Sequence, residues 1–500
     1  MKLLHKGMFT ACLFYPLLLQ AQTEVDALRY SQLSFGSTAR SLSMGGAFGA
    51  LGADFSTLSN NPAGIGVYRK SEFTFSLGFE NTTAESEFMS ENSSDNRFNV
   101  SMPNLGLVFA FTNKKRDSDW KQFSFGLGYN RLASFQSNSF FEGKNPSNSL
   151  LDNFIQQVHN DGGATPEDLF YYYPFDVNLA YQTYLLDPDP NDSLNYVSAI
   201  PYGGEYQSRS VETRGSMGEF VLTFGGNYND KVFWGVTMGF PGIRYEERAI
   251  YEETDKDNQI VSADSSSDFK SFSYHTFLKT TGRGINGKFG LIFKPANFVR
   301  IGAAIHTPTY FYMSDGYDSQ MSSSFANGIS YYQESPIGNY NYTLTTPFRA
   351  IGSLAFIFGK AGLLSFDYEY TDYTDAHFRA NDYSFSSVNR AIDNLYNPSV
   401  NIFRAGTEWK YGAISFRGGA AYYSPAFNSK LDVDTKIDQH SVSYTGGIGF
   451  RGEHFYTDLG YGYTRSGDFY RQYTLDSQDV PGATTTRTSH RVIWTVGFRF

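Results

Sequence analysis

The feature that most constrains this chain is a run of about ten residues, repeated many times, in which apolar side chains alternate with small or polar ones. From residue 73 onward, most of these runs come in pairs joined by a short turn, and a long polar stretch separates one pair from the next. Because successive side chains of a strand point to opposite faces, each run predicts a β-strand with one apolar face. The first run shows it clearly, with Phe73, Phe75, Leu77 and Phe79 on one face.

Counting the runs predicts about fourteen strands, an even number, with short and long connections strictly alternating. Short turns occur, for example, at residues 229–231 and 295–297. This pattern predicts an all-β fold, a 14-stranded antiparallel transmembrane β-barrel over residues 71–500, with short periplasmic turns and long extracellular loops. A soluble sandwich or propeller is the alternative, but it would expose an aromatic face on nearly every strand to water.

The last run, residues 492–500, ends on Phe500. An aromatic residue there resembles the signal by which outer-membrane barrels engage the barrel-assembly machinery. The first residues have the layout of a secretory signal peptide, residues 1–21, with Lys2 and Lys6 before an apolar stretch and cleavage before Gln22. Lipoprotein processing at Cys12 is the alternative, but the apolar core before that residue would be too short.

No later run reaches the ~18 apolar residues of a membrane helix, so any membrane-spanning part must consist of strands. Composition excludes several functions. The net charge is -10 without a basic run, which disfavours nucleic acid as a partner. The single cysteine, Cys12, lies in the predicted signal, so thiolate metal sites and disulfides are not expected, and neither a metal nor a cofactor is predicted.

The segment before the first strand is rich in small residues. It contains Ala39-Arg40-Ser41, Met44-Gly45-Gly46-Ala47, Leu51-Gly52-Ala53-Asp54 and then Asn61-Pro62-Ala63-Gly64. Taken alone, Asn-Pro is an ordinary turn signal. In this order, just ahead of the first strand, these motifs resemble those of the FadL/TodX family, outer-membrane transporters of long-chain fatty acids and aromatic hydrocarbons. The resemblance covers essentially the whole mature chain and is weakest in the external loops.

The resemblance implies a barrel plugged by an N-terminal hatch, residues 22–70, in which Asn61, Pro62, Ala63 and Gly64 form the hatch motif. It also implies that an apolar ligand binds at an external groove, passes to an inner pocket and shifts the hatch. In some members release is thought to be sideways, through a gap in the wall. A plug of this kind argues against an open porin.

Charged residues occupy the polar faces of the predicted strands, which face the lumen. We interpret them as a network of ion pairs that holds the plug, in preference to a catalytic site. Its predicted members are Lys288, Arg300, Arg404, Glu408 and Arg417, together with Arg349, Asp367, Glu369 and Asp458.

The long stretch over residues 140–215 contains a possible short helix after Ser149. Its apolar residues Leu151, Phe154, Ile155 and Val158 have helical spacing, and Phe170 and Tyr171 follow. These residues are candidates for an external apolar groove. A loop that packs its own small core explains them equally well.

The predicted function is passive transport of hydrophobic compounds, such as long-chain fatty acids or aromatic hydrocarbons, across the outer membrane of a Gram-negative cell. Its expected partners are those compounds and the membrane lipid. The alternative is a protein that resembles the shuttles of the type IX secretion system, as some FadL-like barrels in Bacteroidetes do. An enzyme is not expected, because no G-x-S-x-G or H-E-x-x-H motif occurs, although a hydrolase site assembled from distant residues is a third possibility.

Overall fold

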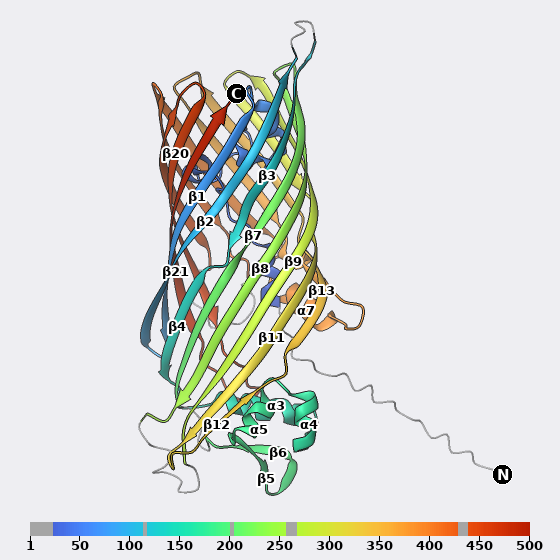
Figure 1. Cartoon of the computed structure of the whole chain (residues 1–500), viewed down its shortest axis with the longest axis vertical. Coiled ribbons are helices and arrows are strands. Elements are labelled where there is room, and N and C mark those ends of the chain that lie inside the picture. The colour runs from blue at the N-terminus through green and yellow to red at the C-terminus, as the bar shows by residue number, and fades with distance from the viewer. Residues whose placement is uncertain (1–23, 114–117, 201–204, 257–267, 429–438) are drawn as a thin grey trace, which may run out of the picture.

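The computed structural model describes residues 24–113, 118–200, 205–256, 268–428 and 439–500. The predicted signal peptide and its cleavage site lie outside the described residues, as does the middle of the turn at residues 113–119. The wall is a closed barrel of fourteen antiparallel strands (Figure 1), as the sequence predicts. Closure occurs where β1 (Glu72–Phe88) pairs with β21 (Ala483–Arg499).

Three barrel strands are interrupted and carry two labels each. They are β3 (Trp120–Ser134) with β4 (Ser137–Lys144), β10 (Val299–His306) with β11 (Tyr310–Phe325), and β14 (Arg349–Phe358) with β13 (Gly338–Thr345). The uninterrupted strands between β1 and β21 are β2 (Glu91–Thr112), β7 (Tyr206–Tyr228), β8 (Val232–Thr254), β9 (Phe269–Ala296), β15 (Gly362–Thr371), β17 (Val400–Tyr411), β18 (Ile414–Tyr423), β19 (Ser441–Arg451) and β20 (Phe455–Tyr470).

Several strands are longer than the ten-residue runs, and this overturns one prediction. β1 and β2 extend far beyond the apolar run to a tight turn at Met89 and Ser90, where the sequence pattern predicts a long polar loop. Both turn residues have positive φ, 50° and 69°, as the tight turns of β-hairpins require. The strict alternation of short and long connections is therefore wrong at this hairpin, because residues 80–97 around the turn are mostly polar on both faces and carry no apolar alternation to reveal the strands.

The segment before β1 lies inside the barrel (Figure 1). It comprises α1 (Glu24–Ser31), α2 (Ala39–Ser43), η1 (Phe55–Leu58) and η2 (Pro62–Val67). Its residues are almost all buried from Ser37 to Ala53. None of the helices in the described ranges is long and apolar enough to cross a membrane.

Two long connections on the side opposite the short turns fold into small structures; in Figure 1 the helices of the first lie at the bottom end, and α7 of the second lies higher, beside the wall. The first, which we call the loop domain (residues 145–200), contains α3 (Leu150–Asn160), α4 (Pro166–Tyr172), α5 (Val177–Gln182) and the hairpin β5 (Leu186–Asp189) to β6 (Asp192–Ser198). The second, residues 372–399, contains η3 (Tyr373–Asp375), β16 (His377–Arg379) and α7 (Ser386–Leu395). A further short strand, β12 (Ser330–Glu334), pairs with the end of β11.

Candidate functional site

The predicted hatch motif is a capped turn pressed against the barrel wall. Asn61 caps η2, since its Oδ1 accepts a hydrogen bond from the Ala63 amide at 3.1 Å, and Pro62 occupies the first turn. The Asn61 Nδ2 donates to the Gly49 carbonyl at 2.6 Å and to the Leu291 carbonyl of β9 at 3.3 Å. One side chain thus joins two parts of the hatch to the wall.

Glycines of the wall make room for this contact. A Cβ added to Gly290 would lie 1.9 Å from the Asn61 Oδ1, and one added to Gly235 would lie 2.1 Å from the Pro62 carbonyl oxygen. The C-terminal end of α2 meets a similar surface at Gly406 and Gly419, where a Cβ would lie 2.4 Å from the Met44 oxygen and 2.3 Å from its carbonyl carbon. Contacts this close leave no space for a side chain, so inward-facing glycines mark where the hatch touches the barrel.

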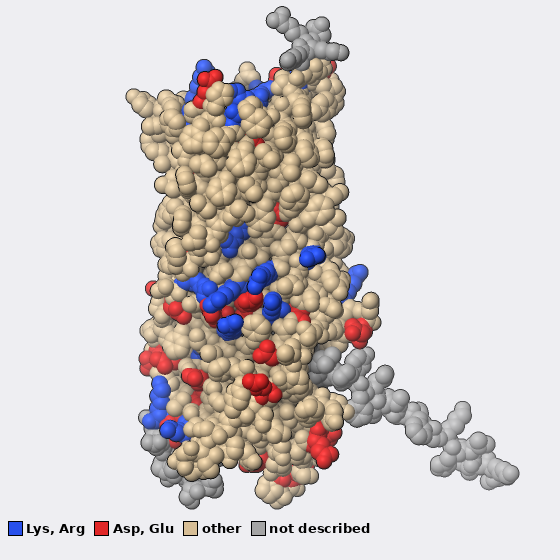
Figure 2. Space-filling model, viewed as in Figure 1, with Lys and Arg blue, Asp and Glu red and all other residues tan. Residues whose placement is uncertain are grey.

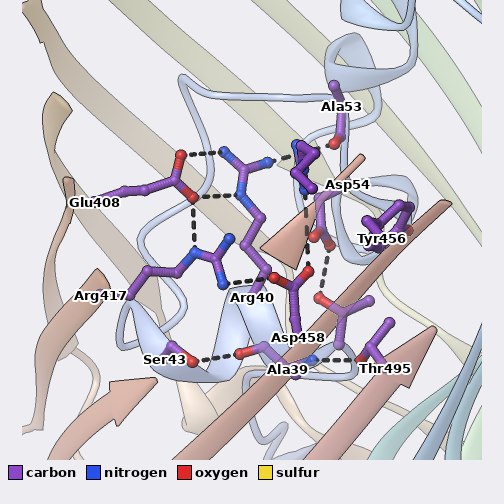
Figure 3. A network of polar contacts seen from close by, with 12 residues as sticks. Ala39, Arg40, Ser43, Ala53, Asp54, Glu408, Arg417, Tyr456, Asp458 and Thr495 are labelled. Atoms are coloured by element: carbon purple, nitrogen blue, oxygen red, sulfur yellow. Dashed lines mark hydrogen bonds and ion pairs between the residues drawn. The ribbon is translucent and has the colours of Figure 1, made fainter. Parts of the chain in front are cut away.

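The hatch is joined to the wall by a chain of four buried charges, which we call the hatch lock: Arg40, Glu408, Arg417 and Asp458 (Figure 3). The Arg40 Nε donates to Glu408 at 2.8 Å, and the Arg417 Nε donates to the same carboxylate oxygen at 2.7 Å. Arg417 also reaches Asp458 at 2.7 Å. Arg40 belongs to the hatch and the other three to β17, β18 and β20, so the lock ties the plug to the wall.

Other wall charges form separate groups around the hatch. Lys288 pairs with Glu219, while Glu369 pairs with Arg349 at 2.5 Å and with Arg404 at 2.8 Å. Asp367 accepts the backbone amides of Phe48 and Gly49 of the hatch, both at 2.9 Å. Buried charges are tolerated when they are paired and hydrogen-bonded in this way.

The predicted network of lumen charges therefore divides into separate groups, and one predicted member, Arg300, forms a different kind of contact. Arg300 has no ion pair in the part of the chain that the structure describes; instead its guanidinium donates to the Leu51 carbonyl of the hatch at 2.7 Å. Sequence reasoning missed Arg40 and Glu219 as partners. The signal that could have identified Arg40 is that it is the only charged residue in the stretch 30–53.

Toward the long loops the lumen changes from polar to apolar. Around α1 the interior is filled by buried apolar side chains, which we call the lumen cluster: Ala27, Leu28 and Tyr30 of α1; Leu132, Met217, Ile243, Tyr245, Phe311, Met313, Tyr342 and Leu344 of the wall; and Phe378, Phe385, Val388, Ile392 and Tyr396 of the second long connection. Met313 and Leu344 are fully buried. A water-filled channel has a polar lumen, so this part of the barrel is not built to hold water.

The hydrogen-bonded wall is interrupted beside the lumen cluster. β2 pairs with β3 only from Thr112 to Asn104, and beyond Asn104 it pairs with β1 alone. β3 continues past this point on β7 alone, with a register shift between Arg131 and Ala133. The Arg97 side chain of β2 crosses the interruption, donating to Gln136 and to Asn138 at 3.2 and 3.1 Å and pairing with Glu212. We call this region the wall gap (residues 97–103 and 131–138).

The predicted external groove is placed differently by the structure. α3 forms, capped by Ser149 as predicted, but Leu151, Phe154 and Val158 are buried in the core of the loop domain and Ile155 packs against that core. Of the six candidate residues only Phe170 and Tyr171 are exposed, by 54% and 75%. The α3 residues therefore form the small core that was the alternative prediction for this loop, and they do not line an open groove.

The structure contains two hollows near the hatch and the wall. One of about 70 Å³ lies between the hatch and the wall, lined among others by Ser59, Asn60, His306 and Arg349. It has room for about two waters but not for an aromatic hydrocarbon. A larger one, about 620 Å³, opens on the outer face of the wall among Phe366, Phe403, Tyr422 and Tyr444. These side chains point away from the lumen, so the larger hollow belongs to the outer surface.

Comparison with solved structures gives the fold an independent reference. A Pseudomonas aeruginosa FadL homologue matches with a TM-score of 0.52 and 12% sequence identity, over 94% of this chain and 99% of that one. The toluene transporter TodX of P. putida matches with a TM-score of 0.51 and 12% identity, over 93% and 99% of the two chains. No protein-family model and no curated protein matches the sequence. At such low identity the likeness is one of fold: this chain is built like the FadL/TodX channels.

Proposed function

We propose that the protein is an outer-membrane channel of the FadL/TodX type that passes hydrophobic compounds, such as long-chain fatty acids or aromatic hydrocarbons, through a barrel gated by its hatch (residues 22–70). The observation that carries this proposal is the lumen cluster. Apolar side chains that face the lumen of a barrel offer nothing to ions or sugars, but they stabilise an apolar molecule by removing its surface from water.

We infer the cargo's route from the neighbours of the lumen cluster. On the short-turn side of the lumen cluster, the hatch lock and the glycine contacts hold the hatch against the wall. Beside it lies the wall gap, since Leu132 of the lumen cluster and the neighbouring buried Ala133 adjoin the register shift of β3. On the outer side Phe98, Val100 and Met102 of β2 are exposed by 63%, 55% and 41%. An apolar molecule that displaces α1 would therefore have a route through the side of the barrel, past the polar contacts of Arg97, onto this exposed apolar face.

The test compares two methionine substitutions. Met313 is fully buried in the lumen cluster, whereas Met238 is half exposed on the outer face of β8. A buried amide without a partner costs roughly 1–3 kcal/mol, so Met313→Gln should reduce uptake of a radiolabelled fatty acid or of toluene about tenfold. Met238→Gln makes the same chemical change outside the lumen and should leave uptake within twofold of wild type.

Folding of both variants is checked by the gel shift that intact barrels show before heating. Equal uptake by Met313→Gln and wild type, with both folded, would contradict the proposal. A deletion strain with normal uptake but without its secreted surface proteins would instead favour the secretion-shuttle alternative.

A further inference from the structure

The outer face of β7, β8 and β9 changes character along its length. Near the short turns it is apolar: Phe220 and Phe224 on β7, Val236, Met238 and Phe240 on β8, and Ile285, Phe289 and Leu291 on β9 are all exposed by 37–58%. On β8 the apolar stretch runs from Val232 to Gly242. Ten residues at ~3.3 Å, tilted by ~40°, span about 25 Å, the height of the apolar band of an outer-membrane barrel.

All three strands end this band in the same cross-strand row. Phe220 is opposite Phe240, and the next outward residue of β9 beyond Ile285, Arg283, is opposite Gly242. From that row to the level of Arg248, the outward positions include five exposed bases, which we call the basic band: Arg214 on β7, Arg244 and Arg248 on β8, and Lys279 and Arg283 on β9. Figure 2 shows Lys and Arg gathered across the middle of this face, with Asp and Glu mostly on the loop side.

The basic band is not neutralised by its neighbours. Two outward carboxylates lie among the five bases: Glu212 pairs with Arg214 at 2.6 Å and Glu246 pairs with Arg244 at 2.9 Å. In the described ranges Arg248, Lys279 and Arg283 have no carboxylate within 4.0 Å, and Arg248 stacks on the Phe277 ring. Five bases and two acids leave a net charge of +3. On the next strand, β11, the residue opposite Phe277 is the acidic Asp318, so the basic band ends at β9.

We propose that the basic band binds the phosphorylated headgroup of a lipid in the outer leaflet. This rests on the proposed function in one respect, that the barrel spans the outer membrane with its long loops outside. The bases begin where the apolar band ends, which is the depth at which lipid phosphates lie. Neighbouring strands are ~4.8 Å apart, so three strands present cations across roughly 10 Å, and arginine pairs with phosphate in a bidentate way.

The test measures lipid binding by the intact, detergent-solubilised protein with native mass spectrometry. The probes are a bisphosphorylated lipid A, the same lipid with its phosphates removed, and inorganic phosphate as competitor. Wild type should bind the phosphorylated lipid at least tenfold more tightly than the dephosphorylated one. The variant Arg244→Gln/Lys279→Gln/Arg283→Gln should lose this preference. The control Arg69→Gln/Lys231→Gln/Lys360→Gln removes the same charge at the short-turn end and should keep it.

Several results would overturn the inference. One is equal binding of both lipids by wild type, and another is a preference that survives in the basic-band variant. A third is full competition by millimolar inorganic phosphate, which would assign the site to a free anion instead of a lipid. The uptake assay separates this inference from the transport proposal: the basic-band variant should import hydrophobic compounds normally. If wild type imports nothing but still needs the basic band for lipid binding, only the transport proposal fails.

Discussion

The hatch and the loop domain both bury polar and charged groups, but in opposite ways. In the hatch lock every buried carboxylate faces an arginine, as Glu408 faces Arg40 and Arg417. In the loop domain Asp176 is buried at the start of α5, where its carboxylate accepts the Val177 amide at 2.6 Å, and no ion pair for it occurs among the described residues. The hatch is thus fixed by paired charges, whereas the loop domain depends on apolar packing and leaves one carboxyl group sensitive to pH.

The largest effect is expected from breaking the hatch lock. Glu408→Ala leaves Arg40 and Arg417 buried without their shared partner, which should cost about 3–5 kcal/mol of stability. Thermal unfolding of the purified barrel measures this loss, and dye entry into cells measures leakage past the loosened hatch. Arg69→Ala, which removes an exposed pair with Asp230, is the control and should cost at most ~1 kcal/mol. Equal stability of the two variants would refute the role of the lock.

A cavity in the loop domain should destabilise that domain alone. Phe154 is buried in its core, so Phe154→Ala should cost about 3 kcal/mol locally. The expected result is faster proteolytic cleavage within residues 145–200 while the heat-dependent gel shift of the barrel is unchanged. If fatty-acid uptake also fell in a variant whose loop remains resistant to protease, Phe154 would have a direct role in ligand capture.

Neighbouring glycines on opposite faces of β18 offer a sharper test of the hatch contact. A Cβ at Gly419 would lie 2.3 Å from the Met44 backbone, whereas one at Gly418 would meet no atom closer than 3.9 Å. Gly419→Ala should therefore shift the hatch, cost about 1–3 kcal/mol and increase leakage. Gly418→Ala should behave as wild type. Crosslinking between cysteines placed in the hatch and in the wall would report the displacement directly.

The most gradual effect should come from pH, because it is spread over the range between the two pKa values of Asp176, 3.8 and about 7. Burial raises the pKa of Asp176 to about 7 from its ordinary 3.8, so the folded loop domain holds this proton more tightly than the unfolded chain does. Its stability should therefore fall as pH rises from about 4 to about 7, by up to ~1.4 kcal/mol per pH unit. Hydrogen exchange of α5 at pH 5 and pH 8 measures this. Asp176→Asn should remove the dependence, and a wild-type protein without it would contradict the explanation.

The sequence was sufficient to predict the barrel, because side chains that alternate with a period of two mark the strands of its wall. It could not predict the β1–β2 hairpin, because residues 80–97 are mostly polar on both faces, nor which charges pair: Arg40 and Glu408 are 368 residues apart. The α3 residues show a further limit. Leu151 and Phe154 form the predicted apolar stripe. Such a stripe indicates that the residues are buried but not what they pack against, and here they pack in the core of the loop domain.

The seam between β1 and β21 has a consequence for biogenesis. It extends over sixteen residues of β1, from Glu72 to Glu87, and joins the first strand synthesised to the last. The hatch precedes β1, yet Glu408, Arg417 and Asp458 belong to the final third of the chain. The hatch is therefore synthesised before the strands that carry its charged partners. The hatch lock can form only after β17, β18 and β20 have joined the wall.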